Sequence, residues 1–300
     1  MKRDRPFISI VVPSYNRADM IADTLRSLQK QDYENYEILV IDDGSTDNTG
    51  EVVRSVADSR IQFIKKNNAE RAAARNFGAA RAKGDYINFF DSDDLALPNH
   101  LSEAAEMIRK NNQPEWFHLA YSWAEPGGKV FRDVNNFTGP SLNYLMPRGN
   151  PLSCNGVFIR KDITEKHQFN EDRELSASED YELWLRLAAS FPLYYSNNIT
   201  SLVIDHEMRS VRTINGEKLI RRLDLLIHYL EKDTHVMNHY KDHFNLIRMD
   251  AHSYIALHLA NVPAYKLKSI SYLYKAFADT PQLLNNKRFY ATLKNILIKW

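Results

Sequence analysis

The sequence has few of the features that mark secreted, nucleic-acid-binding or membrane-spanning proteins. Its 300 residues include one cysteine, Cys154, which excludes an intrachain disulfide framework and is compatible with a reducing compartment. The net charge of +1 argues against a polyanion-binding surface. No apolar run is long enough to cross a bilayer, and residues 1–6 lead into a strand without the apolar region of a signal peptide. These absences predict a cytoplasmic protein that does not bind nucleic acid.

Strands and helices are predicted to alternate over the first 111 residues. Short β-branched or aromatic runs predict strands, and apolar residues at helical spacing predict helices between them. The predicted strands are 7–12, 36–41, 61–64 and 86–90, and the predicted helices are 18–30, 45–56, 69–83 and 98–111. This alternation predicts an α/β fold with a mostly parallel sheet and right-handed crossovers.

The rest of the chain is less regular. Further strands are predicted at 116–123, 157–160 and 201–204, and a helix at 180–190. Residues 125–151 are rich in Gly, Pro and Asn, which predicts a lid or a substrate-shaping loop. Helical periodicity dominates from 216 onward. We therefore expect a first domain over 1–214, with halves 1–112 and 113–214, and a helical region over 215–300.

Polar clusters follow three of the predicted strands. They are Pro13-Ser14-Tyr15, Asp42-Asp43 and Asp91-Ser92-Asp93-Asp94. The carboxyl ends of parallel strands meet at one edge of a sheet, where ligands bind in such folds. Three carboxylates within four residues need a cation or hydrogen-bond donors, and oxygen ligands favour Mg²⁺ or Mn²⁺. The alternative is a solvated acidic turn.

With these residues in view, the chain resembles the family 2 glycosyltransferases, which have a GT-A fold. The resemblance rests on six signals in order: the stretches 8–17 and 41–47, Ala74-Arg75-Asn76, Gly84-Asp85-Tyr86-Ile87, Asp91-Ser92-Asp93-Asp94 and Glu179-Asp180. It implies an inverting enzyme that transfers a single sugar from a nucleotide-diphosphate sugar. The implied acceptor is a saccharide or a lipid-linked saccharide, and the implied role is surface polysaccharide or glycan biosynthesis.

The resemblance implies a divalent cation, Mn²⁺ or Mg²⁺, held by Asp91 and Asp93. Such an ion would stabilise the departing diphosphate. His206 follows a predicted strand and is expected to supply a third, neutral ligand. The alternative is a structural histidine, since a lone histidine is more often structural.

Other residues are expected at the nucleotide. Pro13 and Tyr15 would wrap the base, with Tyr15 as an aromatic platform. The resemblance implies that Asp43 accepts the imide hydrogen of uracil, the alternative being a helix-capping acid. Arg71 and Arg75 lie four residues apart on one helical face, and we expect one of them to bind the diphosphate. Arg17 and Ser92 complete the expected donor contacts.

The acceptor side needs a base, because a sugar hydroxyl is a weak acid at neutral pH. The family's acid-helix motif matches Glu179-Asp180, which implies Asp180 as the base and Glu179 as its neighbour. The alternative is that both acids only complement the positive end of the helix. Arg209 and Arg212 are expected to close over the diphosphate as part of a mobile lid.

Two other functions compete with this hypothesis. One is a non-catalytic module that binds nucleotide sugar or glycan. The other is a sugar-phosphate nucleotidyltransferase, which would be expected to have a glycine-rich basic loop where this chain has residues 13–17. The basic, amphipathic stretch 287–300 is expected to pack on its own domain, with peripheral contact at the inner face of the membrane as the alternative.

Overall fold

The computed structural model describes residues 5–207, 209 and 215–298. The chain divides into two compact units. The first comprises the described parts of 1–143, 152–173 and 190–209, and the second those of 144–151, 174–189 and 210–300. The helix that carries Glu179 and Asp180 therefore groups with the C-terminal helices, whereas the sequence analysis grouped it with residues 1–214.

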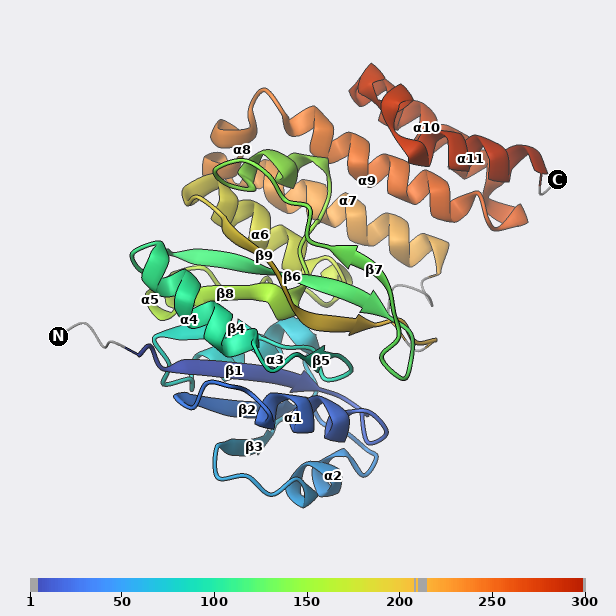
Figure 1. Ribbon diagram of the computed structural model, residues 1–300. Coiled ribbons are helices and arrows are strands. Elements are labelled where there is room, and N and C mark those ends of the chain that lie inside the picture. The colour runs from blue at the N-terminus through green and yellow to red at the C-terminus, as the bar shows by residue number, and fades with distance from the viewer. Residues whose placement is uncertain (1–4, 208, 210–214, 299–300) are drawn as a thin grey trace. The chain divides into compact units, whose positions relative to one another are not determined.

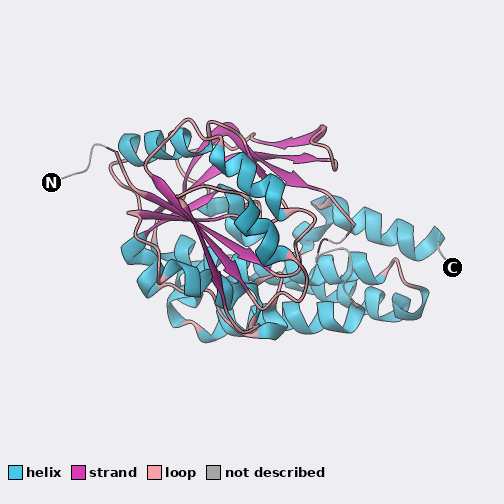
Figure 2. Cartoon of the chain, turned by 90° about the horizontal axis from the view of Figure 1, so that it is seen from below, coloured by secondary structure: helices cyan, strands magenta, loops and turns pink. Residues whose placement is uncertain are grey.

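The first unit is built on one mixed β-sheet (Figure 1). Its strands are β1 (Ile8–Ser14), β2 (Tyr36–Asp42), β3 (Ile61–Lys65), β4 (Tyr86–Phe89), β5 (Leu95–Ala96), β6 (Trp116–Ala124), β7 (Val130–Val134), β8 (Val157–Arg160) and β9 (Tyr194–Ile204). They are ordered β3-β2-β1-β4-β8-β6-β9-β5, and β7 pairs with β6. The strands fan out with a strong twist when seen from below (Figure 2).

The strand directions bring the predicted polar clusters to one edge of this sheet. β1 runs parallel to β2 and β4. β8 runs antiparallel to both β4 and β6, and β9 runs parallel to β6. It follows that β1, β2, β4 and β9 all point the same way, so their carboxyl ends share an edge. The α/β fold expected from the sequence is confirmed, and its sheet is mixed because β5, β7 and β8 run antiparallel to their neighbours.

Five helices flank the sheet in the first unit. They are α1 (Ile21–Gln29), α2 (Thr49–Ser55), α3 (Glu70–Ala79), α4 (His100–Lys110) and α5 (Lys161–Lys166). α1 buries Ile21, Leu25 and Leu28, the three side chains that helical spacing places on one face. α3 packs closely on β1, because a Cβ atom at Gly78 would lie 2.4 Å from Cγ1 of Val11.

The strand predicted at 201–204 is the end of a longer strand. β9 begins at Tyr194 and pairs with β6 through two register shifts. Exposed Asn197 and Asn198 interrupt its apolar pattern, which is why periodicity alone found only its last residues. The irregular stretch 125–151 also contains structure, since β7 forms a hairpin with β6 and a 3₁₀ helix spans Asn143–Arg148.

The second unit is helical, as predicted for the end of the chain. It contains α6 (Glu179–Ser190) as far as Ala189, and then α7 (Gly216–Lys232), α8 (Thr234–Tyr240), α9 (Phe244–Leu259), α10 (Lys266–Asp279) and α11 (Lys287–Ile298). α9 packs against α7, α10 and α11 (Figure 1). The shorter 3₁₀ segments of the chain are Cys154–Gly156, Arg173–Leu175, Pro263–Tyr265 and Pro281–Asn285. Among the described residues, no helix has the length and apolar character needed to span a membrane.

Candidate active site

The expected nucleotide residues lie at the carboxyl ends of β1 and β2. Pro13 is buried near the end of β1, and Tyr15 follows that strand with 47% of its surface exposed. Asp43 follows the neighbouring strand β2, and its backbone N–H donates to the carbonyl oxygen of Ser14 at 2.8 Å. An exposed aromatic ring and a carboxylate therefore stand on adjacent strand ends, an arrangement suited to a planar base.

The Asp43 carboxylate is held by groups that precede α3. Nζ of Lys66 contacts Oδ1 of Asp43 at 2.5 Å, and the backbone N–H of Ala69 donates to the same carboxylate at 3.0 Å. Ala69 directly precedes α3, so Asp43 stabilises the start of that helix. The capping alternative thus has a structural basis, although the helix concerned is α3 and not the one directly after Asp43.

The loop after β1 is fixed to the loop after β2. Asn16 adopts a left-handed backbone conformation, with φ of 51°. Its N–H donates to Oγ of Ser45 at 2.9 Å, and its side-chain oxygen accepts from the N–H of Thr46 at 2.9 Å. This fixed turn presents Arg17, whose Nη2 lies 3.5 Å from Oδ2 of Asp93. Arg17 therefore connects the nucleotide loop to the acidic cluster.

Arg75 reaches the first carboxylate of the cluster. It is buried on α3, and its Nη2 donates to Oδ1 of Asp91 at 2.8 Å. The guanidinium also lies over the ring of Phe169, 5.3 Å from the ring centroid. Arg71 lies one turn earlier on α3 and is half-buried, and Ser92 is buried beside Asp91.

Asp93 and His206 are in direct contact. Nε2 of His206 lies 3.0 Å from Oδ2 of Asp93, although 113 residues separate them in the chain. Burial alone would raise the pKa of Asp93, but the hydrogen bond from His206 and the charges of Arg17 and Arg209 outweigh it and lower that pKa. Asp93 is therefore an anion held at the sheet edge by three basic side chains.

Asp94 is buried, with 1% of its surface exposed. Its Oδ1 accepts from the N–H of Ile204 at 2.8 Å, and its Oδ2 accepts from Nδ2 of Asn155 at 2.7 Å. Burial raises its pKa, and the negative charge of Asp93 adds to this effect. Asp94 thus joins the end of β4 to the end of β9, and it is not positioned as a solvent-facing ligand.

Asn155 is a site residue that sequence reasoning missed. It is fully buried, and besides Asp94 its Oδ1 accepts from the N–H of Asp91 at 2.8 Å. It therefore fixes the acidic turn from a segment more than sixty residues away. The only local signal is the Asn155-Gly156 pair, which is typical of any turn.

Arg209 packs between an acid and an aromatic ring. Its Nη1 donates to the carbonyl oxygen of Ile204 at 2.8 Å and lies 3.4 Å from Oδ1 of Asp94. Its guanidinium lies 5.1 Å from the centroid of Trp123, and that of Arg132 lies 5.1 Å from the same ring. Arg212, the other predicted lid residue, is outside the described part of the chain.

The expected three-residue metal set is only partly assembled. Asp93 and His206 are in contact, whereas Asp91 is directed to Arg75. Within residues 5–207, 209 and 215–298, no three His, Cys, Asp or Glu side chains are grouped to hold a metal ion. A carboxylate beside an imidazole still fits a Mn²⁺ or Mg²⁺ ion that takes its other ligands from phosphate. Nδ1 of His206 is buried without a hydrogen-bond partner among the described atoms, so no hydrogen bond fixes the opposite side of that ring.

The second unit carries the two acids proposed for the acceptor side. Glu179 is buried at the start of α6, and its Oε2 accepts from the N–H of Ala177 at 2.6 Å. Asp180 is half-buried, and its Oδ2 accepts from Nδ2 of Asn150 at 3.2 Å. Glu179 thus fits the helix-terminus alternative, while Asp180 keeps the exposure that a base needs to reach an acceptor.

A buried arginine lies near these acids in the second unit. Arg222 on α7 is 5% exposed. Burial lowers the pKa of Arg222, and the negative charges of Glu179 and Asp180 are among the opposing influences.

Comparison with known proteins identifies the family. Residues 9–115 match the profile of glycosyl transferase family 2. Over 209 residues the chain is 43% identical to the Escherichia coli UDP-Glc:alpha-D-GlcNAc-diphosphoundecaprenol beta-1,3-glucosyltransferase WfgD, a match that covers 66% of this chain and 74% of WfgD. The chain belongs to glycosyltransferase family 2.

Solved structures agree with this family 2 assignment at the level of the fold. The S. aureus TarS 1-349 complex with UDP-GlcNAc superposes with a TM-score of 0.66 at 20% identity, covering 97% of this chain and 88% of the TarS 1-349 chain. The Pyrobaculum calidifontis mannosyltransferase PcManGT, in complex with GDP-Man and Mn²⁺, gives 0.59 at 18% identity, with coverages of 99% and 88%. The GT-A fold expected from the sequence is thereby confirmed. The chain spans a third or less of the length of three Rickettsia glycosyltransferases that it also matches.

Proposed function

We propose that this family 2 protein is an inverting glycosyltransferase that moves one sugar from a uridine-diphosphate donor to a saccharide hydroxyl. The observation that carries the proposal is the Asp93–His206 contact, joined through Arg17 to the Tyr15 and Asp43 strand ends. If the base of the donor nucleotide lies next to Tyr15, the diphosphate of the donor would lie near the basic and acidic groups around Asp93. This order, from base to phosphate to sugar, runs along one sheet edge.

In this proposal Asp93 and His206 would hold Mn²⁺ or Mg²⁺. The ion, when bound, would supply positive charge to the diphosphate leaving group. Arg17 contributes positive charge at the same carboxylate, and Arg75 pairs with Asp91 beside it.

We propose Asp180 as the general base. It accepts the proton of the acceptor hydroxyl as the acceptor oxygen bonds to the anomeric carbon and the bond to the diphosphate oxygen breaks. Attack opposite the leaving group inverts the configuration, through a transition state with oxocarbenium character. Its partial exposure supports the assignment.

The relative WfgD suggests the first substrates to assay. Its name gives UDP-Glc as donor and a GlcNAc-diphosphoundecaprenol as acceptor. We propose a lipid-linked saccharide of this class as the acceptor, a role in surface polysaccharide assembly, and peripheral contact with the inner face of the membrane.

The test is a transfer assay with a panel of nucleotide sugars and a synthetic GlcNAc-diphosphate-lipid acceptor, with and without Mn²⁺. Product that forms from one UDP-sugar, with an inverted anomeric centre, supports the proposal. Donor binding without transfer or hydrolysis would favour a binding module. Formation of pyrophosphate from a sugar phosphate and a nucleoside triphosphate would favour the nucleotidyltransferase alternative.

A further inference from the structure

The C-terminal helices expose an unusual amount of apolar surface. Among the described residues, eight of the thirteen exposed large apolar side chains come from 266–298. These eight are Leu267, Ile270, Tyr274, Phe277, Leu284, Tyr290, Leu297 and Ile298. Contiguous exposed apolar side chains on a soluble protein mark an interaction surface more often than chance.

Four of these residues form a stripe along α10. Leu267, Ile270, Tyr274 and Phe277 recur at intervals of three and four residues, so they fall within an arc of roughly 80° around the helix. Leu267 and Tyr274 are 81% and 72% exposed. We call these four side chains the α10 stripe.

The α10 stripe is separate from the face that α10 uses for packing. The buried residues of α10 are Lys266, Ser269, Tyr272, Leu273 and Ala276, and the helix packs on α9. Folding of the second unit therefore uses one face of α10 and leaves a second apolar face next to it.

α11 contributes less than the sequence suggested. Its Thr292 and Ile296 are buried, and the carbonyl oxygen of Ile296 accepts from Nζ of Lys266 at 3.3 Å. This agrees with the prediction that 287–300 packs on its own domain, as far as the described residues extend. Leu297 and Ile298 at its end remain exposed, at 72% and 69%.

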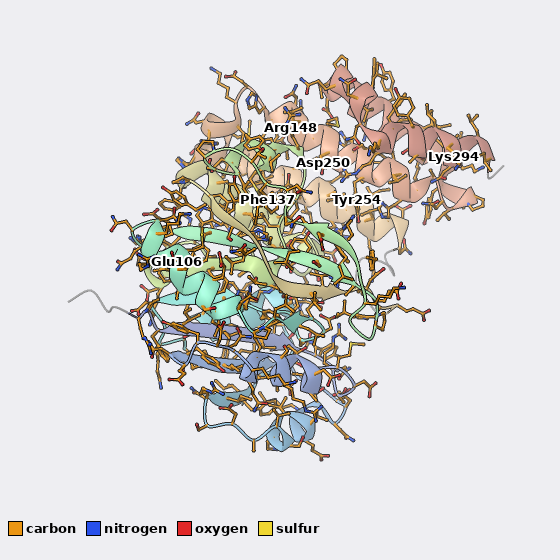
Figure 3. The ribbon with its side chains drawn as sticks, in the orientation of Figure 1. Glu106, Phe137, Arg148, Asp250, Tyr254 and Lys294 are labelled. Atoms are coloured by element: carbon orange, nitrogen blue, oxygen red, sulfur yellow. The ribbon has the colours of Figure 1, made fainter. Side chains whose placement is uncertain are left out.

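The charges of the segment that carries the α10 stripe are almost all positive. Residues 262–298 contain six basic side chains and one acid, Asp279. That acid is paired with Arg248 and His252. The four exposed lysines are Lys268, Lys275, Lys287 and Lys294, the last of which is labelled on α11 in Figure 3. Lys268 forms an ion pair with Glu217 of α7.

We propose that the α10 stripe and these lysines dock the enzyme on the surface of an anionic phospholipid bilayer. An apolar face inserts at the level of the headgroups, while lysines beside it bind anionic phosphates. A second copy of the chain is a poorer occupant, because two faces that each carry an excess of positive charge would repel one another. Docking on the bilayer would bring the enzyme to a lipid-linked acceptor, which lies in that surface. Only this role of the docking surface rests on the proposed function.

The test is co-sedimentation of the purified chain with vesicles, in the absence of any sugar substrate. We expect binding to phosphatidylcholine vesicles that contain about 30 mol% phosphatidylglycerol, and roughly fivefold weaker binding for each lysine replaced by glutamine. Raising the salt from 0.1 to about 0.5 M should weaken binding further, since salt screens exposed charge.

The decisive variant is Leu267→Glu/Tyr274→Glu, which places two acids in the stripe without touching its packed face. We expect at least a tenfold loss of vesicle binding. The matched control is Val130→Glu/Phe131→Glu, two exposed apolar side chains of β7 outside the lysine-rich region, which should bind vesicles as the parent does.

Equal binding of parent and stripe variant to anionic vesicles would overturn the inference. The inference would also be overturned if the parent did not bind vesicles but formed a dimer, and the stripe variant did not form that dimer. The α10 stripe would then join two copies of the chain. Transfer to a short water-soluble acceptor does not need the bilayer, so it should be the same in the parent and the stripe variant. Loss of vesicle binding with retained transfer separates this inference from the proposed function.

Discussion

Asn155 donates a 2.7 Å hydrogen bond to the buried carboxyl group of Asp94 and accepts another from the backbone of Asp91. A single amide from a 3₁₀ segment thereby sets the conformation of the acidic turn. Two of the proposed donor-site groups, Asp91 and Asp93, depend on that turn for their positions.

Replacement of Asn155 by alanine should therefore destabilise the fold. The change leaves Oδ2 of the buried Asp94 carboxyl group and the backbone N–H of Asp91 without their hydrogen bonds to Asn155, which costs about 1–3 kcal/mol for each such group. Urea unfolding would measure it. The control is Asn198→Ala, which removes an exposed hydrogen bond to Glu103 and should change the free energy of unfolding by less than about 0.5 kcal/mol.

Asp93→Ala should abolish metal-dependent donor binding and leave the protein folded. The change removes the carboxylate that contacts His206 and Arg17, so the affinity for UDP with Mn²⁺ should fall to the affinity without metal. Calorimetric titration of UDP in both conditions checks this. Asp162→Ala, at an exposed ion pair with Arg160, should bind like the parent. Retained Mn²⁺ dependence in Asp93→Ala would contradict the ligand assignment.

Asp180→Asn should bind the donor normally yet transfer sugar about 10²–10⁴ times more slowly, the usual loss for a general base. The amide keeps the shape of the side chain but cannot accept the proton. Single-turnover transfer and donor titration separate the two effects. Glu174→Gln alters the nearby exposed acid that pairs with Arg221 and should leave both unchanged. An unchanged transfer rate in Asp180→Asn would show that Asp180 is not the general base.

Two buried histidines should each lower the free energy of unfolding as the pH drops below about 6.5, while the buried Asp94, whose pKa is raised to about 8, contributes in the opposite direction. Burial lowers the pKa of His100 and of His118 to about 3, so the folded state keeps both rings neutral while the unfolded chain protonates them near 6.5. The unfolded state then binds more protons, and each histidine costs about 1.4 kcal/mol per pH unit between about 6.5 and 3. Urea unfolding at pH 7, 6 and 5 should show this loss. His118→Gln should lower the slope by one histidine's share, and an unchanged slope would refute the assignment.

Gly78→Ala should destabilise the protein, although alanine normally favours helices over glycine. The added Cβ would meet Cγ1 of Val11 at 2.4 Å and Cγ1 of Ile41 at 3.0 Å, so α3 would have to move away from the sheet. Overpacking of this kind costs about 1–3 kcal/mol. In Gly50→Ala the nearest atom is the tip of the Phe63 ring at 3.0 Å, which can turn aside. In thermal unfolding, Gly50→Ala should have a clearly higher midpoint temperature than Gly78→Ala.

The elements that sequence analysis found are those with local signals. Strand runs such as 7–12 and 36–41, and the helical spacing of Ile21, Leu25 and Leu28, depend on neighbours in the chain. The polar clusters at strand ends followed from the same pattern. Long-range partners had no such signal, because Lys66 at Asp43 and Asn155 at Asp94 are brought in by the tertiary fold.

The lack of a local signal for long-range partners also explains why some contacts in the structure were not expected from the sequence. Arg75 could be placed on one face of its helix, but the sequence did not reveal that its partner is Asp91. The α10 stripe was also missed, since an apolar face at helical spacing looks the same whether a neighbouring helix covers it or not.

Trp123 gives this protein an intrinsic optical probe. The indoles of Trp116 and Trp184 are fully buried, whereas the ring of Trp123 contacts the guanidinium groups of Arg132 and Arg209. Arg209 also touches Asp94, so a displacement of that arginine during catalysis would alter the emission of Trp123. Stopped-flow fluorescence would therefore report, without a chemical label, whether Arg209 moves when donor is added.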